Sequence, residues 1–326
     1  MKLKTLKDIE VAEKKVLVRA DLDVGKNFGG VERLEVLLPT LDFLDKRNAQ
    51  IVLIGHRGRP GGKVDNSLSM EPVGEKFEKI LKEKWGEKRV EEINMHVLEN
   101  LRFNPGEEAN DEHYAEHLAE EGEIYVNEAF ATSHRKHASI IGIPKYIPGV
   151  CGIRFCEEVE NLEKVRDNPR RPLIILISGV KDGKLRYIDK FREFADRILI
   201  GGRLSEYLGN NFKDEKIFVS GLSDSKLDID EDSIKKYKEI ISKAGTIVLS
   251  GPVSKFEEKE HMQGTKRVFE AVAGSSAFKL AGGGHTRHAI SMLNLKEKFD
   301  WISVGGGSML EFLAKGTLPG IEALLN

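Results

Sequence analysis

Cysteine is scarce in this sequence. Cys151 and Cys156 are the two cysteines among 326 residues. Two are too few for a disulfide framework, and the pair lacks the spacing of a zinc site. We therefore expect both to be reduced, buried thiols.

An excess of charge of one sign is also missing. The chain has 51 Lys and Arg against 53 Asp and Glu, so it lacks the polycationic character that binds nucleic acid. No apolar run approaches the ~18 residues of a membrane span, and Met1-Lys2-Leu3-Lys4 leads into charged residues instead of an apolar signal region. We expect a cytoplasmic protein with neither a nucleic-acid nor a membrane partner. Any anion site must then be a local cluster.

Two nucleotide-binding fingerprints are absent. Gly-x-x-x-x-Gly-Lys-Ser/Thr does not occur, which excludes a P-loop. No good Gly-x-Gly-x-x-Gly follows the first expected strand, which argues against a nicotinamide or sugar-phosphate enzyme on a Rossmann-like sheet.

The sequence does contain a regular alternation of short β-branched runs and amphipathic helical stretches. This rhythm indicates βαβ units, with parallel strands covered on both faces. Because a single core stops growing at roughly 250–300 residues, the length favours two domains. The expected fold class is α/β, with two Rossmann-like domains whose parallel sheets are covered by helices. The clearest strands are expected at 15–19, 50–54, 123–126, 173–177, 197–200 and 246–249.

One amphipathic helix is expected to join the two domains. Phe155, Val159, Leu162 and Val165 recur at helical spacing with charged residues between them, and Asn168-Pro169 ends the pattern. We place the junction at this helix, which would act as a hinge.

The segments that follow the strands are of two kinds. In open α/β sheets, ligands bind beyond the carboxyl ends of the strands. After the first three strands these segments are rich in His, Arg and acidic residues, and after the last three they are rich in Gly and Lys.

Six basic residues of the first half could together form an anion cradle. The arginine fork suits this role because it makes bidentate hydrogen bonds to phosphate or carboxylate. Taken singly, each residue also fits an ordinary surface position. The six are Arg19, Arg33, His56, Arg59, Arg102 and Arg135.

Both halves of the chain contain a series of motifs, most of them at or just after the expected strands. In the first half they are Val18-Arg19-Ala20-Asp21, Gly55-His56-Arg57-Gly58-Arg59-Pro60, Glu99-Asn100-Leu101-Arg102-Phe103 with Pro105-Gly106-Glu107-Glu108, and Tyr125-Val126-Asn127-Glu128-Ala129-Phe130 with His134-Arg135. In the second half they are Ser178-Gly179-Val180-Lys181 with Lys184, Gly201-Gly202, Ser250-Gly251-Pro252 with Phe256-Glu257, Gly282-Gly283-Gly284-His285-Thr286, and Gly305-Gly306-Gly307.

In their residues and their order, these motifs resemble those of the phosphoglycerate kinase family. The resemblance implies that each domain binds one of two substrates. Residues 1–154 would hold 3-phosphoglycerate or 1,3-bisphosphoglycerate, residues 155–312 would hold ATP or ADP with Mg²⁺, and residues 313–326 would form a tail that returns to the first domain. The implied substrate-binding residues are Arg19, Asp21, Asp23, Arg33, His56, Arg59, Arg102 and Arg135. The implied nucleotide-binding residues are Lys181, Lys184, Gly201, Gly202, Pro252, Glu257, Gly283, Gly284 and Thr286, and the implied catalytic residues are Arg33, Lys181, Gly283 and Gly284.

Several features depart from the family pattern, and three of them bear most directly on the binding sites. Asp23 stands where the family has an asparagine, a change that is repulsive beside an anionic ligand. His285 stands where the family has an aspartate that helps to hold Mg²⁺, and Mg²⁺ does not favour nitrogen. A stretch that normally supplies a strand and helps to wall the purine pocket is absent between Asn211 and Lys226.

The function implied by the resemblance is that of a glycolytic and gluconeogenic phosphotransferase. It would move a phosphoryl group between ATP and 3-phosphoglycerate, as a monomer whose hinge closes around its small-molecule substrates. The alternative is a paralogue that retains the anion site, has lost or changed the kinase activity, and acts as a ligand-binding or regulatory protein.

A metal site is a further alternative. It would draw on His134, His137, His285 or His288, although lone histidines are more often structural residues.

Overall fold

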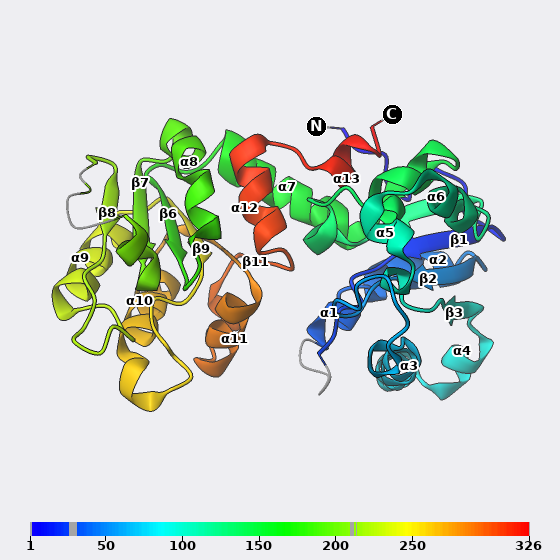
Figure 1. The fold of residues 1–326 in the computed structure, drawn as a ribbon, viewed down its shortest axis with the longest axis horizontal. Coiled ribbons are helices and arrows are strands. Elements are labelled where there is room, and N and C mark those ends of the chain that lie inside the picture. Colours follow the sequence, from blue (N-terminus) through cyan, green and yellow to red (C-terminus); the bar gives the residue numbers. More distant parts are fainter. Residues whose placement is uncertain (1, 26–30, 209–211, 213, 326) are drawn as a thin grey trace. The chain divides into compact units, whose positions relative to one another are not determined.

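The chain forms two compact units in the computed structural model, which describes residues 2–25, 31–208, 212 and 214–325. Unit 1 is Met1–Val159 with Thr317–Asn326, and unit 2 is Glu160–Gly316 (Figure 1). The expected junction at residues 154 and 155 falls inside helix α7 (Ile153–Asp167). Asn211, which borders the expected deletion, lies outside the described residues.

Unit 1 contains a five-stranded parallel sheet with the order β3-β2-β1-β4-β5. The strands are β1 (Lys15–Arg19), β2 (Gln50–Ile54), β3 (Met95–Val97), β4 (Ile124–Asn127) and β5 (Gly149–Cys151). The helices are α1 (Glu32–Glu35), α2 (Leu38–Asp45), α3 (Glu71–Trp85), α4 (Glu87–Glu92), α5 (Pro105–Ala109), α6 (Glu112–Ala119) and α13 (Pro319–Glu322).

Unit 2 contains a six-stranded parallel sheet with the order β11-β10-β9-β6-β7-β8. The strands are β6 (Leu173–Ser178), β7 (Arg197–Gly201), β8 (Ile217–Val219), β9 (Thr246–Ser250), β10 (Phe278–Gly282) and β11 (Trp301–Ser303). Its other helices are α8 (Ile188–Phe194), α9 (Glu231–Ile241), α10 (Gln263–Gly274), α11 (Gly284–Met292) and α12 (Gly307–Lys315).

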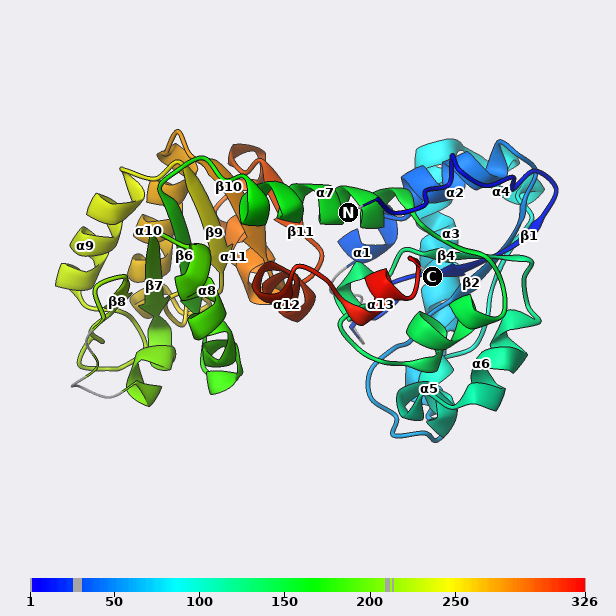
Figure 2. The ribbon, with the colours of Figure 1, turned by 90° about the horizontal axis from the view of Figure 1, so that it is seen from above.

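Helices cover both faces of each sheet, which explains why the strands read as continuous apolar runs. In unit 2, Ile174 and Leu176 of β6 pack in one core with α9 and α10, and the alternate residues face the side of α8 and α12 (Figure 2). The α/β fold class with two parallel-sheet domains is confirmed. No helix in the described part of the chain has the length and apolar character needed to cross a membrane.

The beginning of α7 is held by a buried carboxylate. Glu128, which follows β4, accepts the backbone N–H of Arg154 at 3.1 Å and that of Phe155 at 2.8 Å. Thr40 of α2 hydrogen-bonds the same carboxylate and accepts the N–H of Ile153 at 2.9 Å. Together these side chains satisfy backbone donors that an α-helix leaves unpaired at its N-terminus.

A disulfide joins Cys151 to Cys156, so the expectation of two reduced thiols is wrong. Cys151 ends β5 and Cys156 lies in the first turn of α7. The turn of chain between them brings their Cα atoms to 5.8 Å, within the usual range for a disulfide. The cysteine count excluded a framework of several bridges, and it could not exclude a single local one.

Candidate functional site

Arg19 and His56 form the buried floor of the basic cluster in unit 1. Arg19 ends β1 and is fully buried; its Nε donates to Ser139 Oγ at 2.7 Å and its Nη1 to Ala20 O at 2.6 Å. Its Nη2 lies 3.1 Å from Nδ1 of His56, which follows β2. The donors of Arg19 are therefore directed at protein atoms.

This contact determines the protonation state of His56. Arginine only donates, so Nδ1 of His56 must accept, and the neutral ring carries its proton on Nε2. Burial lowers the pKa of His56 well below its usual value, and the nearby charges of Arg19 and Arg102 lower it further. His56 is thus a neutral N–H donor at this site.

The buried carboxylate of Glu107 holds the residues of this floor in place. Glu107 of α5 accepts from Ser139 Oγ at 2.6 Å and from Ser139 N at 2.9 Å. It lies 3.8 Å from Arg19 Nη2 and 3.6 Å from His137 Nδ1. Burial works against ionisation of Glu107, but the hydrogen bonds from His137 and Ser139 and the charge of Arg19 outweigh it and lower its pKa. Glu107 therefore balances the buried charge of Arg19.

Arg102 has an unused hydrogen-bond donor. It lies in the 3-10 turn after Asn100, is 3% exposed, and donates from Nη1 to Gly58 O at 2.7 Å. Nε lies in an ion pair with Glu108 at 3.1 Å, but neither Nε nor Nη2 makes a hydrogen bond, although both are buried. Burial lowers the pKa of this guanidinium. An anion bound at Nη2 would accept its hydrogen bond and would also balance the positive charge of the guanidinium.

The acidic residues of the cluster have defined partners. Arg33 Nη1 donates to Asp21 Oδ2 at 2.6 Å, which ties the half-buried Arg33 to the end of β1. Asp23 Oδ1 accepts from Gly58 N at 2.8 Å. Its Oδ2 is 3.9 Å from His56 Nε2, and its side chain is 40% exposed. Asp23 thus presents one free carboxylate oxygen beside the neutral histidine.

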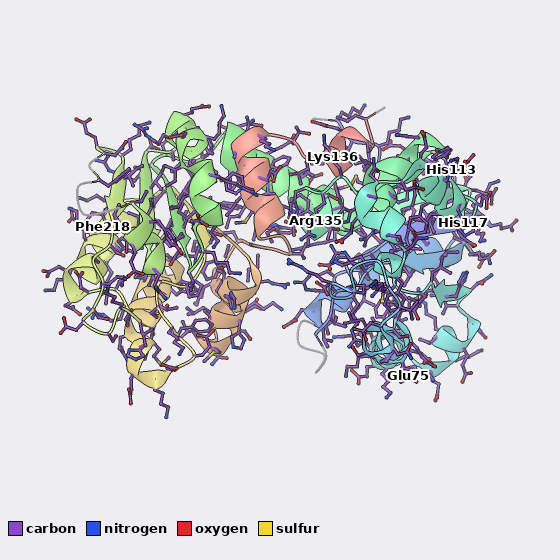
Figure 3. The ribbon with its side chains drawn as sticks, in the orientation of Figure 1. Glu75, His113, His117, Arg135, Lys136 and Phe218 are labelled. Carbon is purple, nitrogen blue, oxygen red and sulfur yellow. A yellow bond between two sulfur atoms is a disulfide. The ribbon has the colours of Figure 1, made fainter. Side chains whose placement is uncertain are left out.

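The two remaining basic residues differ in position. Arg135, which is labelled in Figure 3, is half-buried. Its charge lowers the pKa of both His56 and Arg102, so it lies near them. Arg59 is exposed in the same loop as His56.

In unit 2, Lys184 links the ends of two neighbouring strands. Its Nζ donates to Ser178 O at 2.7 Å after β6, and to Ser250 O at 2.8 Å and Ser250 Oγ at 3.2 Å after β9. An ammonium group has three donors, so all are used. Burial without a carboxylate partner lowers the pKa of Lys184 to about 8. Lys184 thus supplies positive charge at this edge of the sheet but no spare hydrogen-bond donor.

Glycines bring the loops at this edge close together. Gly251 has a φ of 111°, and a side chain there would overlap Ser178 O. Its N–H donates to Thr286 Oγ1 at 2.8 Å, which ties the loop after β9 to the first turn of α11. Gly283 has a φ of 103° and precedes α11, and the space beside Gly284 is open.

The other expected nucleotide residues lie in loops at the same end of the strands. Gly201 ends β7 and Gly202 follows it; both are buried, and a side chain at Gly202 would lie 2.8 Å from Ser178 Oγ. Pro252 accepts from Ser178 Oγ at 2.6 Å. Lys181, Glu257 and His285 are exposed.

Comparison with known proteins decides the family. A family model described as phosphoglycerate kinase matches residues 6–217 and 205–316. The chain belongs to the phosphoglycerate kinase family. Phosphoglycerate kinases of Thermomicrobium roseum and Pseudothermotoga lettingae are 31% and 32% identical to it over 389 and 393 residues, and each alignment covers 99% of both chains.

Two solved phosphoglycerate kinases share the fold. The structure from Pyrococcus horikoshii has a TM-score of 0.85 at 26% identity, covering 99% of this chain and 98% of that chain. The structure from Coxiella burnetii has a TM-score of 0.82 at 27% identity, covering 99% of both chains. These comparisons support the kinase interpretation rather than the non-catalytic paralogue. Because the alignments are longer than the 326 residues of this chain, its relatives contain internal segments that it lacks.

The donors of this phosphoglycerate kinase homologue do not fit the Mg²⁺ site that the family resemblance implies. His285 offers nitrogen, helix α11 carries no acidic residue, and Mg²⁺ prefers oxygen ligands. Within the described ranges, no three His, Cys, Asp or Glu side chains are grouped so that they could hold a metal ion. The same finding leaves the histidine metal-site hypothesis without support.

Sequence reasoning missed the residues that position the kinase's basic groups. Glu107 and Ser139 orient Arg19, and Ser178 and Ser250 hold Lys184. Glu107 lies in the quoted motif after Pro105, and an acidic residue there was the available signal. Its partner Ser139 is 32 residues away in the sequence, so only the fold pairs them.

Proposed function

We propose that this protein transfers a phosphoryl group reversibly between ATP and 3-phosphoglycerate, with the acid bound by unit 1 and the nucleotide by unit 2. The observation that supports this most directly is Nη2 of Arg102, a buried guanidinium nitrogen without a hydrogen-bond partner. Leaving such a donor unpaired costs about 1–3 kcal/mol, and an oxygen of a bound acid phosphate would remove that cost.

In unit 1 the residues would divide into those that touch the acid and those that position them. Arg33, Arg59, Arg102 and Arg135 would neutralise its phosphate and carboxylate, and His56 would donate from Nε2. Arg19 would keep His56 neutral, and Asp21 would orient Arg33. The free oxygen of Asp23 would accept a hydrogen bond from the substrate hydroxyl.

In unit 2 the phosphates would lie against the first turn of α11. Backbone N–H groups after Gly283 and Gly284 would bind phosphate oxygens, as helix N-termini do. The Thr286 side chain would keep this turn attached to Gly251. Lys184 would act through its charge. Glu257 would bind the ribose, and the loops at Gly201, Gly202 and Pro252 would border the nucleotide.

The reaction needs alignment and charge neutralisation rather than covalent catalysis. A carboxylate oxygen of 3-phosphoglycerate forms a bond to the γ-phosphorus of ATP. The bond from that phosphorus to the β–γ bridging oxygen breaks, and ADP retains the electron pair. Lys181 and Arg33 would stabilise the negative charge on the transferring group. Both substrates must be brought into line for this step.

A coupled assay of ADP formation from ATP and 3-phosphoglycerate tests the proposal. Lys181→Ala should lower kcat at least 100-fold while ATP and 3-phosphoglycerate still bind in calorimetric titrations. Lys235→Ala, at an exposed position on α9, is the matched control and should retain full activity. Binding of 3-phosphoglycerate without any turnover or ATP binding would refute the kinase and favour a one-site paralogue. A monomeric state, a cytoplasmic location and a role for Mg²⁺ stay predictions.

A further inference from the structure

The first turn of α11 has an unusual charge pattern for a site that meets nucleotide phosphates. The helix begins Gly284-His285-Thr286-Arg287-His288, and no acidic residue occurs in its first turn or later. Acidic side chains are favourable at helix N-termini because the backbone N–H groups there carry partial positive charge. In α11 that positive charge is not neutralised by a carboxylate of the helix itself.

Further positive charge comes from the neighbouring loops. In the sheet order, β10 is adjacent to β9, and β9 to β6, so the loops after these strands lie side by side. Lys184 places its ammonium between the loops after β6 and β9, and Lys181 is exposed in the first of them. Gly251 N–H binds Thr286, which brings the loop after β9 against α11. Lysines and free backbone donors therefore meet at one edge of the sheet.

Acidic residues near this edge do not form a metal site. Asp182 follows Lys181 in an exposed 3-10 turn, and Glu257 is exposed in the loop after β9. Neither belongs to a group of three potential metal ligands among the residues that the structure describes. His285 is exposed, carries no negative charge and can offer an N–H to a phosphate oxygen.

The lysines, histidines and backbone N–H groups at this site determine which form of ATP it binds more tightly. Free ATP carries about two more negative charges than its Mg²⁺ complex, because the bound cation adds two positive charges next to the phosphates. A carboxylate in the site repels free ATP and attracts the complexed metal. A site of lysines, histidines and backbone donors has the opposite preference.

We infer that unit 2 neutralises the triphosphate with its own cations and helix N-terminus, so that metal-free ATP binds at least as tightly as Mg²⁺-ATP. This inference rests on the proposed function, since it takes ATP to be the ligand of unit 2. His285 is the residue that sets the preference, because it occupies the first turn of α11 without a negative charge.

Calorimetric titration of the full-length protein with ATP in EDTA and with ATP in excess Mg²⁺ tests the inference. The wild type should bind both, with a dissociation constant for free ATP no higher than that for Mg²⁺-ATP. His285→Asp should weaken binding of free ATP about tenfold, because a carboxylate then lies within several ångströms of the phosphates. Its affinity for Mg²⁺-ATP should be unchanged or higher.

The matched control is His285→Asn, which has the shape of the aspartate without its charge. It should keep the wild-type preference, so a change in both variants would indicate a steric effect and overturn the inference. Tenfold tighter binding of Mg²⁺-ATP by the wild type would overturn it as well. Absence of binding for both ATP forms, with the protein folded and 3-phosphoglycerate bound, would instead refute the proposed nucleotide site itself.

Discussion

Replacing Glu128 with glutamine should remove a pH dependence from the stability of unit 1. The carboxyl group is fully buried at the beginning of α7, where its two oxygens accept the N–H groups of Arg154 and Phe155. Burial raises the pKa of Glu128 to about 7, although hydrogen bonds from Thr40 and the α7 backbone favour the ionised form. Glutamine keeps the shape and cannot titrate.

The sign and size of the effect follow from linkage. The folded state binds the proton of Glu128 more tightly than the unfolded state, where the pKa is near the ordinary 4.5. The resulting stabilisation is fully present below the unfolded pKa and is lost as the pH rises through about 7. At about 1.4 kcal/mol per pKa unit, the free energy of unfolding should fall by about 2–3 kcal/mol between pH 5 and pH 8.

Urea denaturation followed by tryptophan fluorescence measures this change. In a Trp301→Phe background, Trp85 on α3 is the remaining tryptophan and reports on unit 1. His56 acts in the opposite direction, because its lowered pKa destabilises the fold as the pH falls. The quantity to compare is therefore the difference between wild type and Glu128→Gln at each pH. An unchanging difference from pH 5 to pH 8 would refute the reasoning, and Glu116→Gln on the exposed side of α6 serves as the control.

Three further predictions follow from single side chains. Cys156→Ser should lower the free energy of unfolding by about 2 kcal/mol because it opens the short loop closed by the disulfide, and a reductant should bring the wild type to the same value in thermal denaturation. Arg102→Ala should weaken 3-phosphoglycerate binding about 30-fold, equivalent to about 2 kcal/mol, without changing ATP binding in calorimetry; equal affinities would show that Nη2 does not meet the ligand. ATP affinity should decline as the pH rises above about 8, since Lys184 then loses its proton, and Lys184→Gln should bind weakly with a flatter pH profile.

Much of the fold follows from local sequence patterns. The six expected strands correspond to β1, β2, β4, β6, β7 and β9, which are the buried strands with long β-branched runs. The strands β3, β5, β8, β10 and β11 were not among them. The strands of three residues are too short for a periodic pattern, and the five residues of β10 include no β-branched side chain. Pairing with a neighbouring strand defines them instead.

The kind of motif that follows the strands in each half of the chain could also be predicted from the sequence. Basic motifs follow strands of the first half and glycine-rich motifs follow strands of the second, and the parallel sheets place each set at the carboxyl ends of its strands. Residue type and position along the chain were enough for this, because each strand end is defined by its own local pattern.

Only the tertiary structure decided which groups the donors of each basic side chain bind. Arg19 reads as a ligand-binding residue, yet its donors are directed at Ser139, Ala20 and His56. Lys184 likewise uses its donors within the strand ends. Ser139 and His56 are 120 and 37 residues from Arg19, and Ser250 is 66 residues from Lys184. Because most buried polar groups are hydrogen-bonded, the role of each basic residue depends on which segments the fold brings to it. The sequence by itself determined the elements and the kind of chemistry at their ends, whereas long-range packing selected the donors that stay available to a ligand.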